Sequence, residues 1–106
     1  MTMKHAFLIM AHGSLPLLRV LLSMLDDERN DIFLHIDRKS DMLDGAEPLV
    51  LSKARLFLLE QRVDVRWGNL SQIKAEYVLF EEALKHGPYA YYHLLSGQDL
   101  PIKSQD

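Results

Sequence analysis

The chain has 106 residues, of which 48% are hydrophobic and 25% are charged, as is typical of one small globular domain. Its net charge of −3 lacks the basic excess of nucleic-acid-binding domains, so we expect no nucleic-acid partner. There is no cysteine, which excludes a disulfide framework and a thiolate metal site and is consistent with a reducing compartment. No apolar run is long enough to span a bilayer.

The first element is a short apolar run at residues 6–11, which predicts a central strand covered on both faces. A signal peptide would need a longer apolar core and a small-residue cleavage site, so the strand is favoured. Ser14 can cap a following helix, and Pro16 suits a first helical turn. Apolar residues then recur at helical spacing and predict one wide buried stripe: Leu17, Leu18, Val20, Leu21, Leu22, Met24 and Leu25.

Residues 31–37 predict a second buried strand, so the first third of the chain forms a βαβ unit. Residues 42–53, punctuated by glycine and proline, predict a loop with at most one helical turn. Residues 55–60 indicate a short third strand. The alternating pattern at residues 63–68 fits either a short strand or an extended loop.

The clearest helix begins at Asn69 or Ser71 and ends before Pro88. Basic residues near its end suit the negative helix terminus, and Gly87 suits a left-handed cap. Four apolar residues at helical spacing predict the stripe that this helix buries: Ile73, Tyr77, Phe80 and Leu84.

A last buried strand begins at Tyr91 and runs directly into a polar turn, residues 96–99, closed by Pro101. Two other predicted strands also end in polar turns, at residues 12–14 and 37–40. If the strands are parallel neighbours, the three turns converge on one edge of the sheet, where open α/β sheets bind their ligands.

Asp37 at the end of the second strand is well placed to accept hydrogen bonds from ribose hydroxyls or a base N–H, or it is simply a turn residue. Arg38 and Lys39 beside it fit either a phosphate contact or a solvated surface pair. His12 fits a donor to a uracil carbonyl or a phosphate, or a residue that caps and packs.

Within the last turn, Gly97 allows a close backbone approach to a ligand, and Asp99 is the strongest single candidate for a ligand contact. Ser96 and Gln98 add a hydroxyl and an amide. The alternative is an ordinary turn with a side-chain-to-backbone hydrogen bond. The pair Trp67–Gly68 fits the wall of a sugar or base pocket, or a half-buried core tryptophan.

No metal site is expected. The five histidines lack a paired ligand spacing, and no Asp-x-Asp pair is present to hold a divalent cation at a diphosphate. The closest approach is the tripeptide at residues 35–37, with histidine in place of the first aspartate. We interpret the histidines other than His12 as structural.

Four blocks, in order, carry a family resemblance: residues 7–12, residues 32–40, residues 65–71 leading to Ala75, and residues 93–103. Together they resemble the N-terminal part of the Core-2/I-branching enzyme family, glycosyltransferase family fourteen, which includes β-1,6-N-acetylglucosaminyltransferases and protein xylosyltransferases. The resemblance covers nearly the whole chain.

The resemblance implies a GT-A-type, Rossmann-like α/β fold and an inverting, metal-independent transfer of a sugar, most often N-acetylglucosamine, from a UDP-sugar to a glycan hydroxyl. It implies that residues 1–106 are the donor-binding part of a truncated domain whose catalytic base lies downstream. By the same match, uridine is held near His12, Asp37 and Arg38. The donor pocket is lined by Trp67, Gly68, Ser96, Gly97, Gln98 and Asp99.

Since the chain starts at the first strand without the anchor of eukaryotic relatives, we expect a bacterial-type, cytoplasmic member, with peripheral attachment to the inner membrane left open. An uncovered sheet edge would favour self-association. Two other classes stay open: a non-catalytic α/β module that binds a nucleotide or a protein, and a small flavodoxin-like or receiver-type domain. A receiver needs an acidic pair after its first strand, where this chain has His12 and Gly13.

Overall fold

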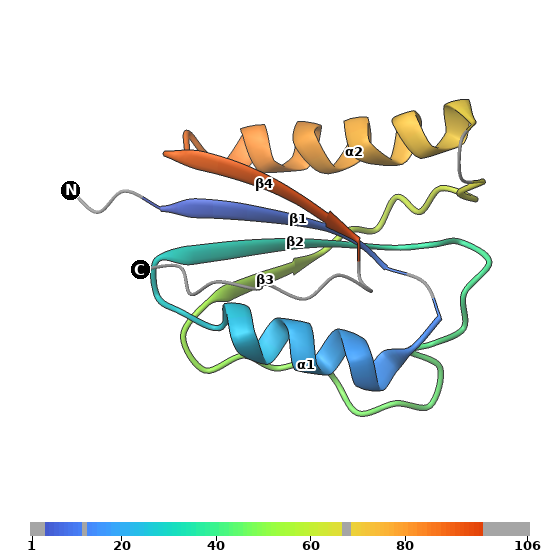
Figure 1. Cartoon of the computed structure of the whole chain (residues 1–106), viewed down its shortest axis with the longest axis horizontal. Coiled ribbons are helices and arrows are strands. Elements are labelled where there is room, and N and C mark those ends of the chain that lie inside the picture. The colour runs from blue at the N-terminus through green and yellow to red at the C-terminus, as the bar shows by residue number, and fades with distance from the viewer. Residues whose placement is uncertain (1–3, 12, 67–68, 97–106) are drawn as a thin grey trace.

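The fold is taken from a computed structural model that describes residues 4–11, 13–66 and 69–96, apart from the side chain of Ser96. Four parallel strands form one sheet in the order β3-β2-β1-β4, with α1 on one face and α2 on the other (Figure 1). The expected α/β fold, a parallel sheet flanked by helices, is therefore confirmed. The elements are β1 (His5–Ala11), α1 (Leu15–Leu25), β2 (Asn30–Ile36), β3 (Arg55–Leu58), α2 (Leu70–His86) and β4 (Tyr91–Ser96).

The two central strands, β1 and β2, are buried because both of their faces are covered, as their continuous apolar sequences predicted. Successive side chains of a strand point to opposite faces, so β1 divides its residues between two clusters. Leu8 and Met10 join the cluster under α2, whereas Phe7 and Ile9 join the cluster under α1. The central strands thus fix both helices in place.

Helix α1 begins as predicted, because the Ser14 side chain accepts a 3.2 Å hydrogen bond from the Leu17 N–H. The predicted stripe was too wide, since Val20 and Met24 are 48% and 52% exposed. The helix lies on one sheet face only, so just one side of it can be buried. That side carries Leu18, Leu21, Leu22 and Leu25.

Helix α2 begins and ends close to the prediction but buries a different face. Its buried residues are Ala75, Val78, Leu79 and Ala83. The small side chains let the helix axis lie close to β1 and β2, so packing favours this side over the more hydrophobic one. The predicted buried stripe instead faces solvent, with exposed fractions from 37% to 68%, at Ile73, Tyr77, Phe80 and Leu84.

Gly87 follows α2, and its N–H donates to the Ala83 carbonyl at 3.0 Å. The predicted left-handed cap is wrong, because Gly87 has φ −82°. A Cβ there would lie 3.1 Å from Cδ2 of Tyr89 and from the Tyr92 hydroxyl, so these side chains would have to move by a few tenths of an ångström. Close packing, and not backbone handedness, is what favours glycine at this turn.

The predicted loop at residues 42–53 is confirmed. Its end is tied to α1, because the Asp26 carboxylate accepts 2.8 Å hydrogen bonds from three successive backbone N–H groups, those of Ser52, Lys53 and Ala54. These bonds position the chain at the start of β3. The strand ends at Leu58, two residues before the predicted end at residue 60. Residues 59–66 form the extended loop that was one of the two alternatives, with Val63 and Val65 buried.

A buried carboxylate, Asp31, joins several segments at the amino-terminal edge of the sheet. It is fully buried and accepts hydrogen bonds from Lys4, Arg55 and Tyr89, the last at 2.6 Å. Burial opposes its ionisation, but the Arg55, Tyr89 and Lys4 hydrogen bonds outweigh burial and lower the pKa of Asp31. This cluster lies at the end of the sheet opposite Asp37, so we regard it as structural.

Candidate functional site

The strand order creates a reversal point beside β1. From β1 the chain adds β2 and then β3 toward one edge of the sheet, and it returns to add β4 on the other side of β1. Parallel α/β sheets bind ligands outside the carboxyl ends of the strands at such a point. Here that point is flanked by the chain positions that follow Ala11 and Ser96. The structure therefore confirms that the three predicted turns leave neighbouring parallel strands.

Asp37 directly follows β2 at this edge, and its side chain is only 7% exposed. Its backbone N–H extends the pairing to β1, donating to the Ala11 carbonyl at 3.0 Å. Its Oδ1 accepts from the Lys39 N–H at 3.0 Å and from the Val65 N–H at 3.4 Å. Asp37 is thus a turn residue, as one of the two alternatives predicted, and its contact with a ligand stays a prediction.

Burial disfavours the charged form of Asp37, but the backbone N–H and ammonium of Lys39, with the Val65 N–H, outweigh burial and lower the pKa of Asp37. The group is therefore a carboxylate at neutral pH. Its Oδ2 accepts only from the Lys39 ammonium among the described residues, at 3.1 Å. A carboxylate oxygen has capacity for a second donor, such as a hydroxyl.

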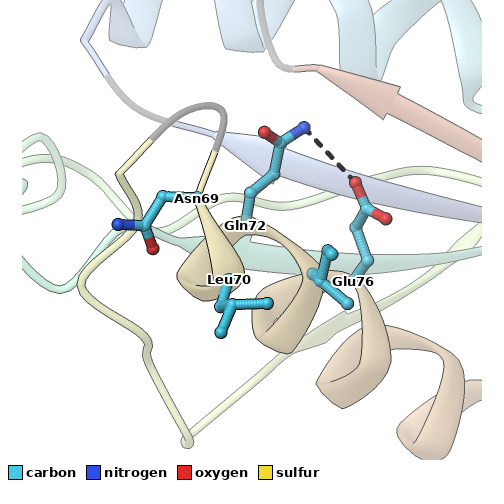
Figure 2. Close-up of a pocket in the computed structure, with 5 residues that line it drawn as sticks. Asn69, Leu70, Gln72 and Glu76 are labelled. Carbon is cyan, nitrogen blue, oxygen red and sulfur yellow. Dashed lines mark hydrogen bonds between the residues drawn. The ribbon is translucent and has the colours of Figure 1, made fainter.

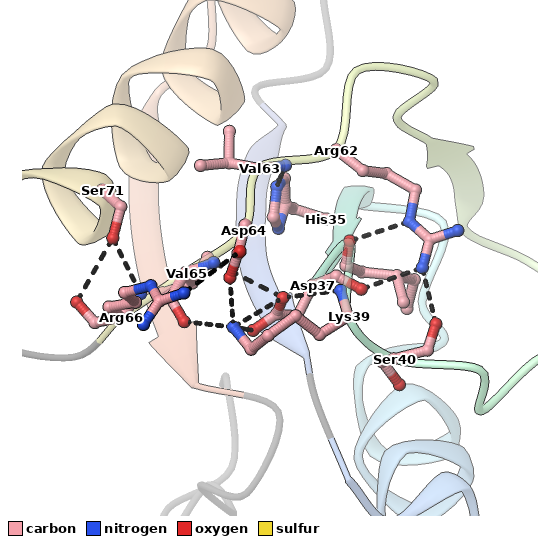
Figure 3. Close-up of polar contacts among 11 residues, drawn as sticks. His35, Asp37, Lys39, Ser40, Arg62, Val63, Asp64, Val65, Arg66 and Ser71 are labelled. Atoms are coloured by element: carbon pink, nitrogen blue, oxygen red, sulfur yellow. Dashed lines mark hydrogen bonds and ion pairs between the residues drawn. The ribbon is translucent and has the colours of Figure 1, made fainter.

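Lys39 bridges two carboxylates. Its Nζ lies 3.1 Å from Oδ2 of Asp37 and 2.6 Å from Oδ1 of Asp64, and it also donates to the Val65 carbonyl at 2.6 Å (Figure 3). The Asp64 hydrogen bond and the Asp37 carboxylate raise the pKa of Lys39 despite opposing desolvation. Lys39 thus braces the turn from a half-exposed position, and its predicted phosphate contact stays a prediction.

Arg62 fixes the same turn from the outside. Its guanidinium donates to the carbonyls of Ile36, Asp37 and Ser40 at 3.1, 2.8 and 2.7 Å (Figure 3). The planar fork of arginine suits several carbonyls at once, which lysine could not match. The Asp37 carbonyl also accepts from the Ser40 N–H at 2.9 Å, so Arg62 adds to the turn's own hydrogen bonding and helps to hold the turn in one conformation.

His35 of β2 supports the turn through the neighbouring segment after β3. It is fully buried, and its Nε2 accepts a 2.9 Å hydrogen bond from the Val63 N–H, which requires the proton on Nδ1. Nδ1 finds no partner among the described residues. Burial lowers the pKa of His35, with partial opposition from the Asp37 charge. His35 is therefore a neutral structural residue, as predicted.

Charged side chains of both signs surround this turn. Arg38, Lys39, Arg62 and Arg66 lie around it together with the carboxylates of Asp37 and Asp64, and the exposed Asp41 follows it. The Arg38 side chain is exposed, while its N–H donates to the Val63 carbonyl at 3.0 Å. An exposed arginine beside an ordered turn suits an anionic ligand.

Most of the predicted ligand residues lie outside the described part of the chain: His12, Trp67, Gly68, Gly97, Gln98 and Asp99. Ser96 is described only as the last residue of β4, paired with Met10 of β1. The structure therefore brings Asp37 and Arg38 together and leaves the other assignments as predictions.

A shallow depression of about 630 Å³ opens along the first turns of α2. Figure 2 shows Gln72 and Glu76 on the same side of the helix, joined by a 3.4 Å hydrogen bond. Neither Asp37 nor Arg38 lines it. The depression is a separate surface feature and not the turn that the strand ends form.

A family model described as Core-2/I-Branching enzyme matches residues 5–106 of the chain. The chain belongs to the Core-2/I-branching enzyme family. This confirms the resemblance of the four sequence blocks and supports a glycosyltransferase-like function. Comparison with curated proteins finds no match.

None of the described helices is long and apolar enough to cross a membrane. Within the same residues, no group of three or more histidine, aspartate or glutamate side chains is arranged to hold a metal ion.

Sequence reasoning missed two residues of the Asp37 turn, Arg62 and Asp64. Both belong to the segment after β3, and nothing in their local sequence marks them as partners of a turn that lies more than twenty residues earlier. Only the parallel pairing of β2 with β3 brings the segment after β3 to the end of β2. That pairing could not be read from periodicity alone.

Proposed function

We propose that this chain binds the UDP moiety of a sugar-nucleotide donor at the carboxyl edge of the sheet. The observation that carries the proposal is the reversal point between β1 and β4 with the ordered Asp37 turn one strand away. In this proposal Asp37 accepts from uridine through Oδ2, and the Arg38 guanidinium attracts the diphosphate. His12, Trp67, Gly68 and residues 96–99 complete the pocket.

The proposed reaction is the inverting transfer of N-acetylglucosamine from the UDP-sugar to a hydroxyl of a glycan acceptor, without a metal ion. Inversion requires a base that deprotonates the attacking hydroxyl and positive groups that stabilise the leaving diphosphate. We assign donor binding to this chain and leave the catalytic base unassigned. The absence of cysteine fits the cytoplasmic location that we propose.

Isothermal titration calorimetry with UDP, GDP and ADP tests the donor assignment. We expect UDP-selective binding that EDTA leaves unchanged. Asp37→Asn should weaken it by about ten- to a hundredfold, because losing a hydrogen bond to a charged group costs roughly 1.5–3 kcal/mol. Asp41→Asn, a change at an exposed carboxylate in the following loop, should leave UDP affinity unchanged.

Arg38→Met should weaken UDP more than uridine, since the arginine is assigned to the diphosphate. Lys53→Met, which removes an exposed cation before β3, is the matched control. A folded chain that binds no nucleotide, or binds all three equally, contradicts the proposal and favours a protein-binding module.

A further inference from the structure

The outer face of α2 carries an apolar seam with the spacing of a coiled coil. Its residues are separated by three, four, three and four positions, which is the heptad pattern of two interacting helices. Their exposed fractions are 80%, 61%, 68%, 37% and 67%. We call this set the outer seam: Leu70, Ile73, Tyr77, Phe80 and Leu84.

The outer seam lies on the side of α2 that faces away from the sheet. At 100° per residue, its members cluster nearly opposite the buried side formed by Ala75, Val78, Leu79 and Ala83. Figure 1 shows α2 as the outermost layer, with no described element above it. One helix therefore carries two apolar sides, and the sheet covers only one of them.

The seam is large enough for a specific interface. A fully exposed large apolar side chain offers on the order of 150–250 Å², so the five residues expose roughly 600 Å² per copy. Two such faces would bury roughly 1,200 Å², at the lower end of specific protein interfaces. This size suits a reversible dimer.

The helix is preformed, so association would not have to create it. The Asn69 side chain caps its start with a 2.8 Å hydrogen bond from the Ser71 N–H, and the buried side packs on β1 and β2. Two isolated heptads would be too short to pair in water, because forming the helix costs conformational entropy. Since α2 is already helical in the folded chain, most of this entropy cost does not fall on association.

The charged residues beside the seam select the orientation of a partner helix. Lys74 and Glu81 flank one side of the seam, and Glu76 flanks the other. In a parallel pair, Glu81 would face Glu76 of the other helix, which is repulsive. In an antiparallel pair, Lys74 of each copy faces Glu81 of the other, so two opposite-charge contacts form.

We propose that α2 pairs with α2 of a second copy of this chain, antiparallel and about a two-fold axis, through the outer seam. A two-fold interface needs one surface that is complementary to itself. The outer seam meets this condition through its apolar stripe and its Lys74–Glu81 flank. The two candidate sites of the dimer then lie on separate subunits, and the interface covers neither Asp37 nor Arg38.

Sedimentation velocity of the full chain over a wide concentration range tests the proposal, with circular dichroism to confirm folding. We expect a reversible monomer–dimer equilibrium. Tyr77→Glu should abolish the dimer, whereas Tyr91→Glu, at a similarly exposed tyrosine on β4, should leave it intact. A chain that stays monomeric at all concentrations, or a dimer lost in Tyr91→Glu and kept in Tyr77→Glu, overturns the proposal.

Charge exchange tests the orientation. Lys74→Glu and Glu81→Lys should each weaken the dimer at least threefold, because each places like charges opposite one another twice. The double exchange should restore the wild-type dissociation constant. Failure of the double exchange to restore it, when both single variants weaken the dimer, contradicts the antiparallel arrangement.

Discussion

The guanidinium of Arg62 donates a 2.8 Å hydrogen bond to the main-chain carbonyl of Asp37, the residue that follows the second strand. The carboxylate of the same aspartate is held from the other side by Lys39. The turn is therefore fixed through both its backbone and its side chain. A site that is held in this way presents Oδ2 of Asp37 in a defined direction, which is what ligand binding requires.

Arg62→Met should lower the free energy of unfolding by about 1–2 kcal/mol, because three carbonyls lose a charged donor and water can reach only some of them. Arg66→Met should change it by less than about 0.5 kcal/mol, since Arg66 is exposed and its closest approach to Asp64 is 3.7 Å. Urea unfolding of the two variants makes the comparison. Equal effects would show that Arg62 is an ordinary surface arginine.

Asp31→Ala should lower the free energy of unfolding by about 1.5–3 kcal/mol, because Arg55, Lys4 and Tyr89 lose their shared acceptor while water can still reach the two cations. Tyr89→Phe removes one hydrogen bond from the same cluster and should cost about 1 kcal/mol. Denaturant melts at neutral pH provide both values. A loss below about 1 kcal/mol for Asp31→Ala would contradict the assignment of the cluster as a structural tie.

Acidification below about pH 6.5, the ordinary pKa of histidine, should destabilise the protein because of buried His35. Burial lowers its pKa in the folded chain, so the unfolded chain binds a proton that the folded chain does not. Stability is thus full above about pH 6.5 and falls as the pH decreases toward the folded pKa. Carboxylates with lowered pKa add their own loss only below about pH 4.

His35→Gln tests this assignment, since the glutamine carbonyl can still accept from the Val63 N–H but does not titrate. The variant should show a shallower decline of stability below about pH 6.5, in urea unfolding at each pH. Part of the decline should remain, because the pKa of His93 is also lowered, by burial and by His5. An unchanged slope would mean that His35 is not the responsible group.

Two leucines of α2 report which side of the helix faces the core. Leu79→Ala should lower the free energy of unfolding by about 2–5 kcal/mol, because Leu79 is fully buried between α2 and the sheet. Leu84→Ala should cost less than about 0.5 kcal/mol at concentrations where the chain is monomeric, because Leu84 is 67% exposed. A reversed order would show that the helix packs through the side that periodicity predicted.

The sequence predicted the strands and both helices well because their signals are local. The continuous apolar runs of β1 and β2 require coverage on both faces, and Ser14 and Asn69 cap helices by contacts within three residues. The buried side of α2 could not be predicted, because Ala75 and Ala83 are less hydrophobic than the outer seam. Close approach to the sheet, and not hydrophobicity, selected them.

The candidate site likewise contains one residue that the sequence predicted and supporting residues that it did not. Asp37 was found because it follows a buried strand, which is a local signal. Asp64 holds the Lys39 ammonium that contacts Asp37, and Arg62 donates to the Asp37 carbonyl. Both contacts depend on the chain returning beside β2 after more than twenty residues. Periodicity carries no information about that return, so the turn residues were predicted and the residues that hold them were not.

A uridine nucleotide should bind at the carboxyl edge of the sheet, and amide chemical-shift mapping with UDP measures this binding residue by residue. We expect saturable shifts that cluster at residues 12–14, 37–39 and 96–99, with little change at Asp31 or Tyr89 at the opposite edge. Shifts confined to the amino-terminal edge or to the outer seam, or no shifts from a folded chain, would contradict it.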